Sequence, residues 1–150
     1  MIAASPVMSK SSDLHFEYAC GCLIIRTIGR GLLDHKEASV QAITAASKAQ
    51  SVKAVLVDMR TIPGPYTFMD RYQLGELVAR YLAHLPIAAL VLEKQADPRR
   101  IGQIVANNRG AKVEVFTKPT DAERWLKKYL TAPEESPASR DGQPSEFIRL

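Results

Sequence analysis

The sequence has little cysteine and histidine, the residues that form disulfides and many metal sites. Its 150 residues include two cysteines, Cys20 and Cys22, with a single glycine between them. A disulfide between them would be strained because so short a loop distorts the bond geometry, so we expect a reducing compartment. The histidines, His15, His35 and His84, have no metal-ligand neighbour at the spacing of a helix turn. We therefore predict no bound metal.

Long apolar runs and the signature motifs of enzymes are also missing. The longest uninterrupted apolar runs are a few residues long, whereas a membrane-spanning helix needs about 20. The first residues, MIAASPVMSKSSD, lack the apolar stretch of a secretory signal. The chain has no G-x-S-x-G, no P-loop and no G-x-G-x-x-G motif. We therefore predict a cytoplasmic protein that has no catalytic activity and no cofactor.

A strong excess of one charge is absent as well. The formal net charge is +4, and residues 131–150 hold two arginines against four acidic residues, so the positive excess lies in the rest of the chain. Such a mildly basic surface suits an anionic lipid or a phosphate-bearing ligand, or is a soluble surface with spare lysines. Nucleic-acid binding needs a denser Lys/Arg cluster with exposed aromatic residues. We therefore predict no nucleic-acid partner.

Strand and helix patterns alternate along residues 13–130 and predict an α/β domain with a mostly parallel, mixed sheet. Residues 1–12 are small and polar and are expected to be flexible, and residues 131–150, rich in Pro, Ser and acidic residues, are expected to form a disordered tail. The predicted strands are 14–18 and 22–27, which form an N-terminal hairpin, then 54–57, 87–92 and 113–116. The predicted helices are 34–49, 67–82, 97–108 and 119–130.

Residues that favour helix starts occur at three places. Asp34, with Glu37 three residues later, has the spacing of a capping box. Thr67 is a good N-cap, and Asp70 then lies in the first turn, where the helix dipole favours a carboxylate. Asp97 is predicted to cap a further helix that has proline at its first position. The helix from Thr67 carries an apolar stripe that we expect to pack on a sheet: Leu74, Leu77, Val78, Tyr81 and Leu82.

Two glycines have predicted structural roles. Gly110 follows the third helix and is expected to end it in the left-handed conformation. Gly75 lies inside the second helix, where glycine costs about 1 kcal/mol relative to alanine. We expect it to permit close approach of another element, either within the domain or from a second subunit in a homodimer.

Four segments, in order along residues 14–130, resemble SpoIIAA-like proteins of the STAS domain superfamily. They are VLVDMR, YTFMDRYQLGELVARYL, VANNRG and VEVFTKPTDAERWL. The resemblance implies a STAS-like single domain that is not an enzyme and that binds a partner protein, a nucleotide or a lipophilic ligand. It also suggests that some relatives associate with membranes or hold small apolar molecules between helices and sheet.

The resemblance also raises an alternative, a phosphorylation switch. In anti-sigma factor antagonists, a partner kinase phosphorylates a serine at the start of the helix that follows the central strand. Here no serine lies between Ser51 and Ser136. The nearest hydroxyl groups belong to Thr61, Tyr66 and Thr67, and of these Thr67 is the candidate phospho-acceptor. The same side chain is also expected to serve as the N-cap.

Ligands in open α/β sheets bind at the carboxyl ends of the strands. Three loops should meet at that edge, 60–67, 93–97 and 117–118, and bring cations close to helix N-termini, which favour anions. Arg99 and Arg100 fall in the first turn of their predicted helix, where a cation opposes the dipole. Either a bound anion offsets that cost, or the two side chains extend into water.

The loop that precedes the second helix is apolar. Ile62, Tyr66, Phe68 and Met69 follow one another without a charged residue between them. If exposed, they form an apolar patch beside basic residues, which suits a membrane surface or a lipid. Alternatively, Phe68 and Met69 close over the core at the start of the helix.

These observations predict a binding or regulatory module whose site is the loop between the central strand and the second helix. The expected partner is an anionic, amphipathic or lipophilic small molecule, a protein or a membrane surface, the last placing the protein peripherally at the membrane. The alternative is an antagonist-type switch that uses Thr67. The predicted ligand-binding residues are Arg60, Tyr66, Thr67, Phe68, Lys94 and Arg99.

Overall fold

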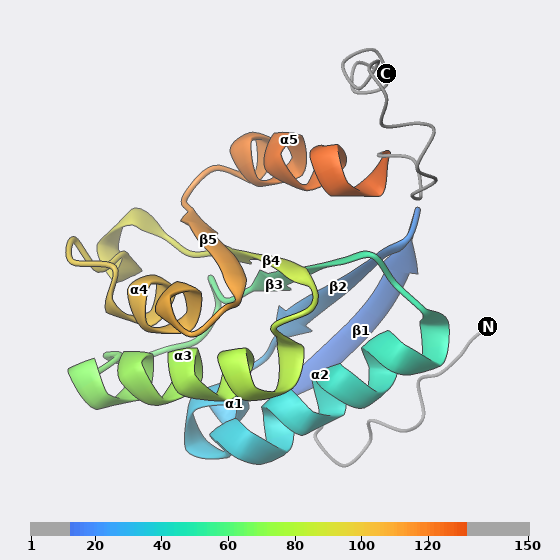
Figure 1. Cartoon of the computed structure of the whole chain (residues 1–150). Helices are drawn as coiled ribbons and strands as arrows, with labels where there is room; N and C mark the ends of the chain where they lie inside the picture. The colour runs from blue at the N-terminus through green and yellow to red at the C-terminus, as the bar shows by residue number, and fades with distance from the viewer. Residues whose placement is uncertain (1–12, 132–150) are drawn as a thin grey trace.

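Five strands form one mixed sheet across residues 13–131, the part of the chain that the computed structural model describes. The strands lie side by side in sequence order, with β1 antiparallel to β2 and each later pair parallel. Figure 1 shows this sheet with helices on both sides. The strands are β1 (Leu14–Ala19), β2 (Cys22–Thr27), β3 (Ala54–Asp58), β4 (Pro86–Leu90) and β5 (Lys112–Phe116).

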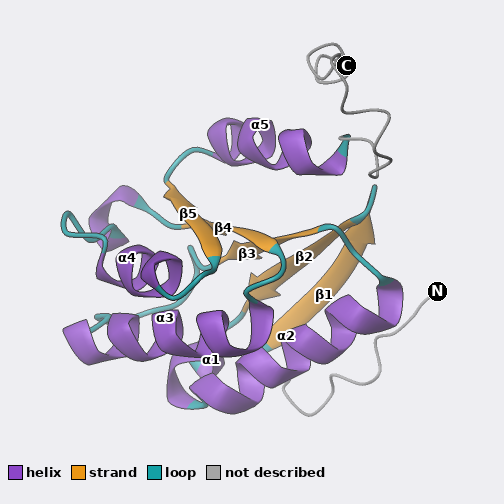
Figure 2. Ribbon diagram, in the orientation of Figure 1, coloured by secondary structure: helices purple, strands orange, loops and turns teal. Residues whose placement is uncertain are grey.

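The helices that connect parallel strands share one face of the sheet, and the last helix covers the other (Figures 1 and 2). Right-handed crossovers that add strands in one direction place their helices on the same side, so α2, α3 and α4 form one layer and α5 the opposite layer. The helices are α1 (Gly31–Asp34), α2 (Lys36–Gln50), α3 (Phe68–Leu82), α4 (Ile101–Asn108) and α5 (Pro119–Leu130), with a short 3-10 turn, η2 (Glu93–Gln95), before α4.

Each face of the sheet has its own apolar cluster. The larger cluster lies under α2, α3 and α4 and includes the fully buried Leu23, Ile25 and Val55. In the smaller cluster, Ala54 and Ala88 of the sheet pack with residues of α5 that include Ala122. Because both faces are covered, the middle strands are apolar along nearly their whole length, as the sequence of β3 indicates.

The predicted fold class is confirmed, since the domain is α/β with a mostly parallel, mixed sheet. The N-terminal hairpin and the later strands occur where the sequence predicts them, with β4 shifted to Pro86–Leu90. Leu82 of the predicted apolar stripe is buried, and the other four members are partly buried against the larger cluster. The predictions for residues 1–12 and for the tail, apart from Thr131, lie outside the described residues.

The predicted start of the first long helix is wrong. Residues 31–34 form a separate helical turn, α1, because Leu32 and Leu33 are buried in the core there. α2 begins at Lys36, and its N-cap residue, His35, makes no side-chain capping bond. The carboxylate of Glu37 instead accepts a hydrogen bond of 2.7 Å from the Tyr81 hydroxyl and so links α2 to α3.

The predicted start of the helix before β5 is also wrong. α4 begins at Ile101, and the residues before it form a turn. The Asp97 carboxylate still accepts backbone hydrogen bonds from Arg99, at 3.1 Å, and from Ile101, at 2.9 Å. Arg100 is the N-cap residue and has a left-handed backbone, with φ +52°. Arg99 therefore lies outside the helix, and the predicted conflict with the helix dipole does not arise there.

Gly75 brings α3 and α4 together within the domain. A Cβ atom at this position would lie 2.6 Å from the carbonyl oxygen of Gly102 and 3.1 Å from Cβ of Val105. The glycine is therefore required by the crossing of two helices of the same chain, as one of the two sequence-based alternatives expects. Gly110, with φ +98°, follows the end of α4 as predicted.

Candidate functional site

A cavity of about 420 Å³ lies between the sheet and the layer formed by α2, α3 and α4. Its volume falls within the range of about 300–1,000 Å³ that is typical of small-molecule sites. We call it the sheet–helix cavity. Its apolar lining comes from the sheet (Val55, Val57, Ile87, Ala89, Val113, Val115) and from the helices (Leu32, Val40, Ile43, Leu74, Val78, Leu82, Ala106).

The cavity exists because the inner face of the sheet is incompletely filled. Ala89 is the fourth residue of the five-residue β4, and its methyl group leaves space that a larger side chain would occupy. Val113 and Val115 on β5, and Leu74 and Val78 on α3, belong to the larger cluster but are only partly buried. In a close-packed core such residues would be shielded on all sides, so their exposure marks the space between the layers.

Polar residues gather at one end of the cavity. Its lining includes Asp97, Arg100 and Thr117, which lie in the loops that follow β4 and β5, and Gln103, which lies in the first turn of α4. Pro98 lies beside them in the loop that follows β4. Among the residues that line the cavity, Pro98 and Arg100 are the exposed ones. We call Pro98 and Arg100 the mouth of the cavity. It lies at the carboxyl ends of parallel strands, the edge that the sequence predicts for a site.

Arg71 joins three segments beside the cavity. Its guanidinium donates hydrogen bonds to the carbonyl oxygens of Tyr66, at 2.7 Å, and Gln95, at 3.0 Å. Nε of Arg71 also lies 3.9 Å from Oδ2 of Asp97. Through these contacts α3 fixes both the loop that precedes it and the turn that precedes α4. Both terminal nitrogens of Arg71 thus already donate to the protein.

Tyr66 and Gln95 complete a polar wall with Arg71. The Tyr66 hydroxyl donates to the carbonyl oxygen of Met59, at 3.1 Å, and accepts from Nε2 of Gln95, at 3.2 Å. Oε1 of Gln95 accepts a hydrogen bond of 2.6 Å from the backbone N–H of Leu92. Burial raises the pKa of Tyr66 to about 12, although the charge of Arg71 partly opposes this. The hydroxyl is therefore a neutral donor at physiological pH.

A second cavity, of about 460 Å³, lies on the other side of this wall. We call it the loop groove, because residues 60–66 line it together with Leu92 and Lys94, and Tyr66, Arg71 and Gln95 line both cavities. The structure thus brings together three of the predicted ligand-binding residues, Arg60, Tyr66 and Lys94. The other three, Thr67, Phe68 and Arg99, line neither cavity.

Arg60 is not a free cation in the loop groove. Its Nε and one terminal nitrogen donate to the two carboxylate oxygens of Asp58, at 3.0 and 2.9 Å. Burial raises the pKa of Asp58, but the hydrogen bonds and charge of Arg60 outweigh this and lower it. A contact from the segment that follows β2 also holds the loop of the groove in place, because the Arg30 guanidinium donates to the Pro63 carbonyl oxygen at 2.7 Å.

Phe68 and Met69 do not close over the core. They are 47% and 51% exposed, and they form the first turn of α3. The Arg99 guanidinium lies 5.9 Å from the centroid of the Phe68 ring, within the range of a cation–π contact. The alternative in which both side chains cover the core is therefore wrong, and an apolar surface beside a cation is present. Ile62, by contrast, is buried.

Thr67 is the N-cap of α3, as predicted. Its hydroxyl oxygen accepts a hydrogen bond of 3.0 Å from the backbone N–H of Asp70, and the Asp70 carboxylate accepts one of 2.9 Å from the N–H of Thr67. Nζ of Lys36 lies 3.0 Å from the same carboxylate. Thr67 is exposed, but a phosphate placed on it would adjoin the negative charge of Asp70.

No protein-family model matches the chain, and a search of curated proteins finds none with a significantly similar sequence. The resemblance to SpoIIAA-like proteins therefore stays a prediction. Within residues 13–131, no group of three His, Cys, Asp or Glu side chains is placed to hold a metal ion. No helix in the same part of the chain is long and apolar enough to cross a membrane.

Several residues of the site were missed by reasoning from sequence. Arg71 follows the N-cap turn of an evident amphipathic helix, and nothing in its neighbourhood distinguishes it from a solvent-exposed arginine. The residues around Gln95 do not indicate its role either, although its position in a loop at the carboxyl end of a strand is typical of binding residues. Ala89 indicates a cavity only when the residues that surround it on the neighbouring strands and helices are known.

Proposed function

We propose that this protein is a non-catalytic binding module for a small amphipathic molecule whose apolar part occupies the sheet–helix cavity. The observation that carries the proposal is an apolar cavity of about 420 Å³ with its polar residues gathered at one end. Small-molecule sites typically have this composition, a mostly apolar wall with a few converging polar groups. The site lies next to the predicted loop, and Tyr66 belongs to both.

The apolar lining of the cavity favours an apolar occupant. The cavity opens to solvent at its mouth, so part of this lining is in contact with water. A ligand that covers the lining gains about 25 cal/mol per Å² of apolar surface removed from water, and an apolar chain adds no unpaired buried polar group.

The shape of the cavity indicates the size of the apolar part. Its floor crosses three neighbouring strands, β3, β4 and β5, and adjacent strands lie about 4.8 Å apart, so the floor is roughly 10 Å across. An extended chain advances about 1.2 Å per bond, so a chain of about eight carbons spans this distance. The deep lining is aliphatic, which suits an acyl or alkyl chain.

A ring placed at the centre of the cavity tests the proposal. Ala89→Phe adds a group that needs about 150 Å³ and divides the remaining space. We expect 1-octanol to bind the wild-type protein, as measured by isothermal titration calorimetry, and to bind Ala89→Phe at least about tenfold more weakly. A tenfold change corresponds to about 1.4 kcal/mol. The melting temperature of Ala89→Phe should be no lower than that of the wild type, because the ring fills existing space.

Two control variants separate occupation of the cavity from other effects. Ala45→Phe adds the same ring on the exposed surface of α2 and should leave octanol binding unchanged. Ala88→Phe adds it one residue away on the opposite face of β4, where Ala88 is fully buried in the smaller cluster, and should destabilise the fold by about 1–3 kcal/mol or more. Undiminished octanol binding by Ala89→Phe, or no binding by the wild type, would contradict the proposal.

The alternative, an antagonist-type switch at Thr67, stays a prediction. The geometry favours it less than it favours binding in the cavity, because the Thr67 oxygen is engaged as an N-cap and lies beside a carboxylate.

A further inference from the structure

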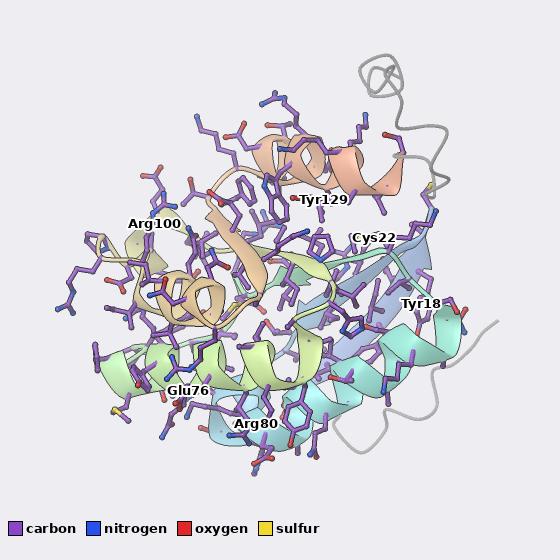
Figure 3. All side chains as sticks on the ribbon, viewed as in Figure 1. Tyr18, Cys22, Glu76, Arg80, Arg100 and Tyr129 are labelled. Atoms are coloured by element: carbon purple, nitrogen blue, oxygen red, sulfur yellow. The ribbon has the colours of Figure 1, made fainter. Side chains whose placement is uncertain are left out.

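We infer that Arg100 recognises an anionic head group, a carboxylate, on the amphipathic ligand of the sheet–helix cavity. This inference rests on the proposed function, because it assigns the polar end of the same ligand. Arg100 is exposed at the mouth, and Figure 3 shows it on the opposite side of the molecule from Tyr18 and Cys22. A chain that lies along the cavity floor toward β5 brings its head to this residue.

The other charged residues of the lining are already neutralised by the protein. The lining carries two cations, Arg71 and Arg100, and one anion, Asp97. Arg71 donates to two backbone carbonyl oxygens and lies near Asp97. The Asp97 carboxylate accepts from two backbone N–H groups. Arg100 is the charged group at the mouth that a ligand can engage without breaking these bonds.

The contacts that Arg100 does make are long and exposed. One terminal nitrogen lies 3.4 Å from Oε1 of Gln103 and 3.7 Å from Oε2 of Glu114. Exposed ion pairs of this kind contribute little to stability, so they are readily exchanged for a bidentate bond to a carboxylate. The same Gln103 oxygen accepts a 2.9 Å hydrogen bond from the N–H of Val115, so it is retained by β5 when the arginine turns away.

The backbone conformation at Arg100 allows a variant that removes the side chain without straining the backbone. Its φ of +52° is a conformation that glycine adopts without strain. Arg100→Gly therefore removes the guanidinium without a cost to the fold, and its melting temperature should be no lower than that of the wild type. Arg99→Ala is the matched control, because Arg99 is the adjacent cation, is more exposed and lies outside the cavity lining.

Isothermal titration calorimetry with sodium octanoate and 1-octanol, near neutral pH and at low salt, separates the contribution of the head group to the affinity from that of the alkyl chain. We expect octanoate to bind the wild-type protein about tenfold more tightly than octanol. Arg100→Gly should lose this preference, with octanol affinity unchanged, and Arg99→Ala should retain it.

Each other outcome has a distinct meaning. Equal affinities of the two probes for the wild type would overturn the role of Arg100 and leave the proposed function standing. An equal loss of both probes in Arg100→Gly would do the same, because it would show an effect on shape rather than on charge. Binding of neither probe to the wild type would overturn the proposed function and this inference with it.

Discussion

The carboxylate of Asp97 holds the turn between β4 and α4 in place. It accepts hydrogen bonds from the N–H groups of Arg99 and Ile101 and lies near the guanidinium of Arg71. Burial raises the pKa of Asp97, but these N–H groups and the nearby guanidinium charges outweigh burial, and the pKa is lowered. The ionised form is thus the one that the folded protein stabilises.

The direction of this pKa shift determines how the stability depends on pH. A group whose pKa is lower in the folded state stabilises fully above its unfolded pKa, which is about 3.9 for aspartate, and loses that contribution as the pH falls through the folded pKa. Asp97→Asn should lower the free energy of unfolding by about 1.5–3 kcal/mol at neutral pH. The difference from the wild type should shrink below about pH 4, as measured by urea unfolding.

Glu123→Gln, an exposed carboxyl on α5, is the control for Asp97→Asn and should have little effect at either pH. A difference between Asp97→Asn and the wild type that stays the same in acid would show that the carboxylate charge is not what holds the turn.

The role of a single residue can be predicted from sequence where local chemistry decides it. The spacing of Thr67 and Asp70 alone predicts a cap, because it brings the two groups together. The roles of Arg71 and Gln95 depend on partners 24 to 36 residues away in the chain, and spacing carries no such information. The exposure of Phe68 was one of two alternatives, and only the packed structure decides between them.

At the element scale, the crossing of α3 and α4 shapes one wall of the sheet–helix cavity. Gly75 and Gly102 both line the cavity, and each lies against the backbone of the other helix or of its first turn. The two helices therefore touch through their backbones. Larger residues at these positions would separate the helices and change the cavity between them and the sheet.

Gly75→Ala should lower stability although alanine is the better helix former. Alanine favours a helix interior by about 1 kcal/mol relative to glycine, but the new Cβ atom would meet the backbone oxygen of Gly102 at 2.6 Å. Overpacking of this kind costs about 1–3 kcal/mol, so we expect a net decrease in the free energy of unfolding, measured with urea.

Gln73→Gly and Gln73→Ala, on the exposed side of the same helix, are the control pair. They measure the helix propensity alone, and the alanine variant should be the more stable by about 1 kcal/mol. If Gly75→Ala raised the stability of the protein by that full amount, the added Cβ atom would have no packing cost, and the close crossing would not be a constraint.

Elements were the most predictable level of this protein. The sequence predicts strands such as β2 to within a residue, because apolar runs bounded by glycine have few other interpretations. The two errors, at the starts of α2 and α4, have a common cause. Asp34 and Asp97 are good capping residues, but burial of Leu32 and Leu33 in one case and a left-handed Arg100 in the other place the helix start elsewhere.

The proposed function of the whole molecule depends on a cavity that several elements form together. The sheet–helix cavity is bounded by the sheet, by α2, α3 and α4, and by the loops that follow β4 and β5. The sequence predicts the edge of the sheet at which a site should lie. It does not predict the cavity volume. This volume is the space between the sheet and the helices minus the volume of the side chains that fill it, and those side chains come from segments far apart in the sequence.

Native mass spectrometry of the protein purified from its own host tests directly whether a ligand occupies the sheet–helix cavity. The native mass is compared with the denatured mass and with that of Ala89→Phe purified in the same way. We predict an added mass that is present under native conditions, is lost on denaturation and is strongly reduced in Ala89→Phe. A phosphate-sized increment that survives denaturation would favour the Thr67 switch instead. A bare chain mass for the wild type under native conditions, or an added mass undiminished in Ala89→Phe, would contradict a ligand in the sheet–helix cavity.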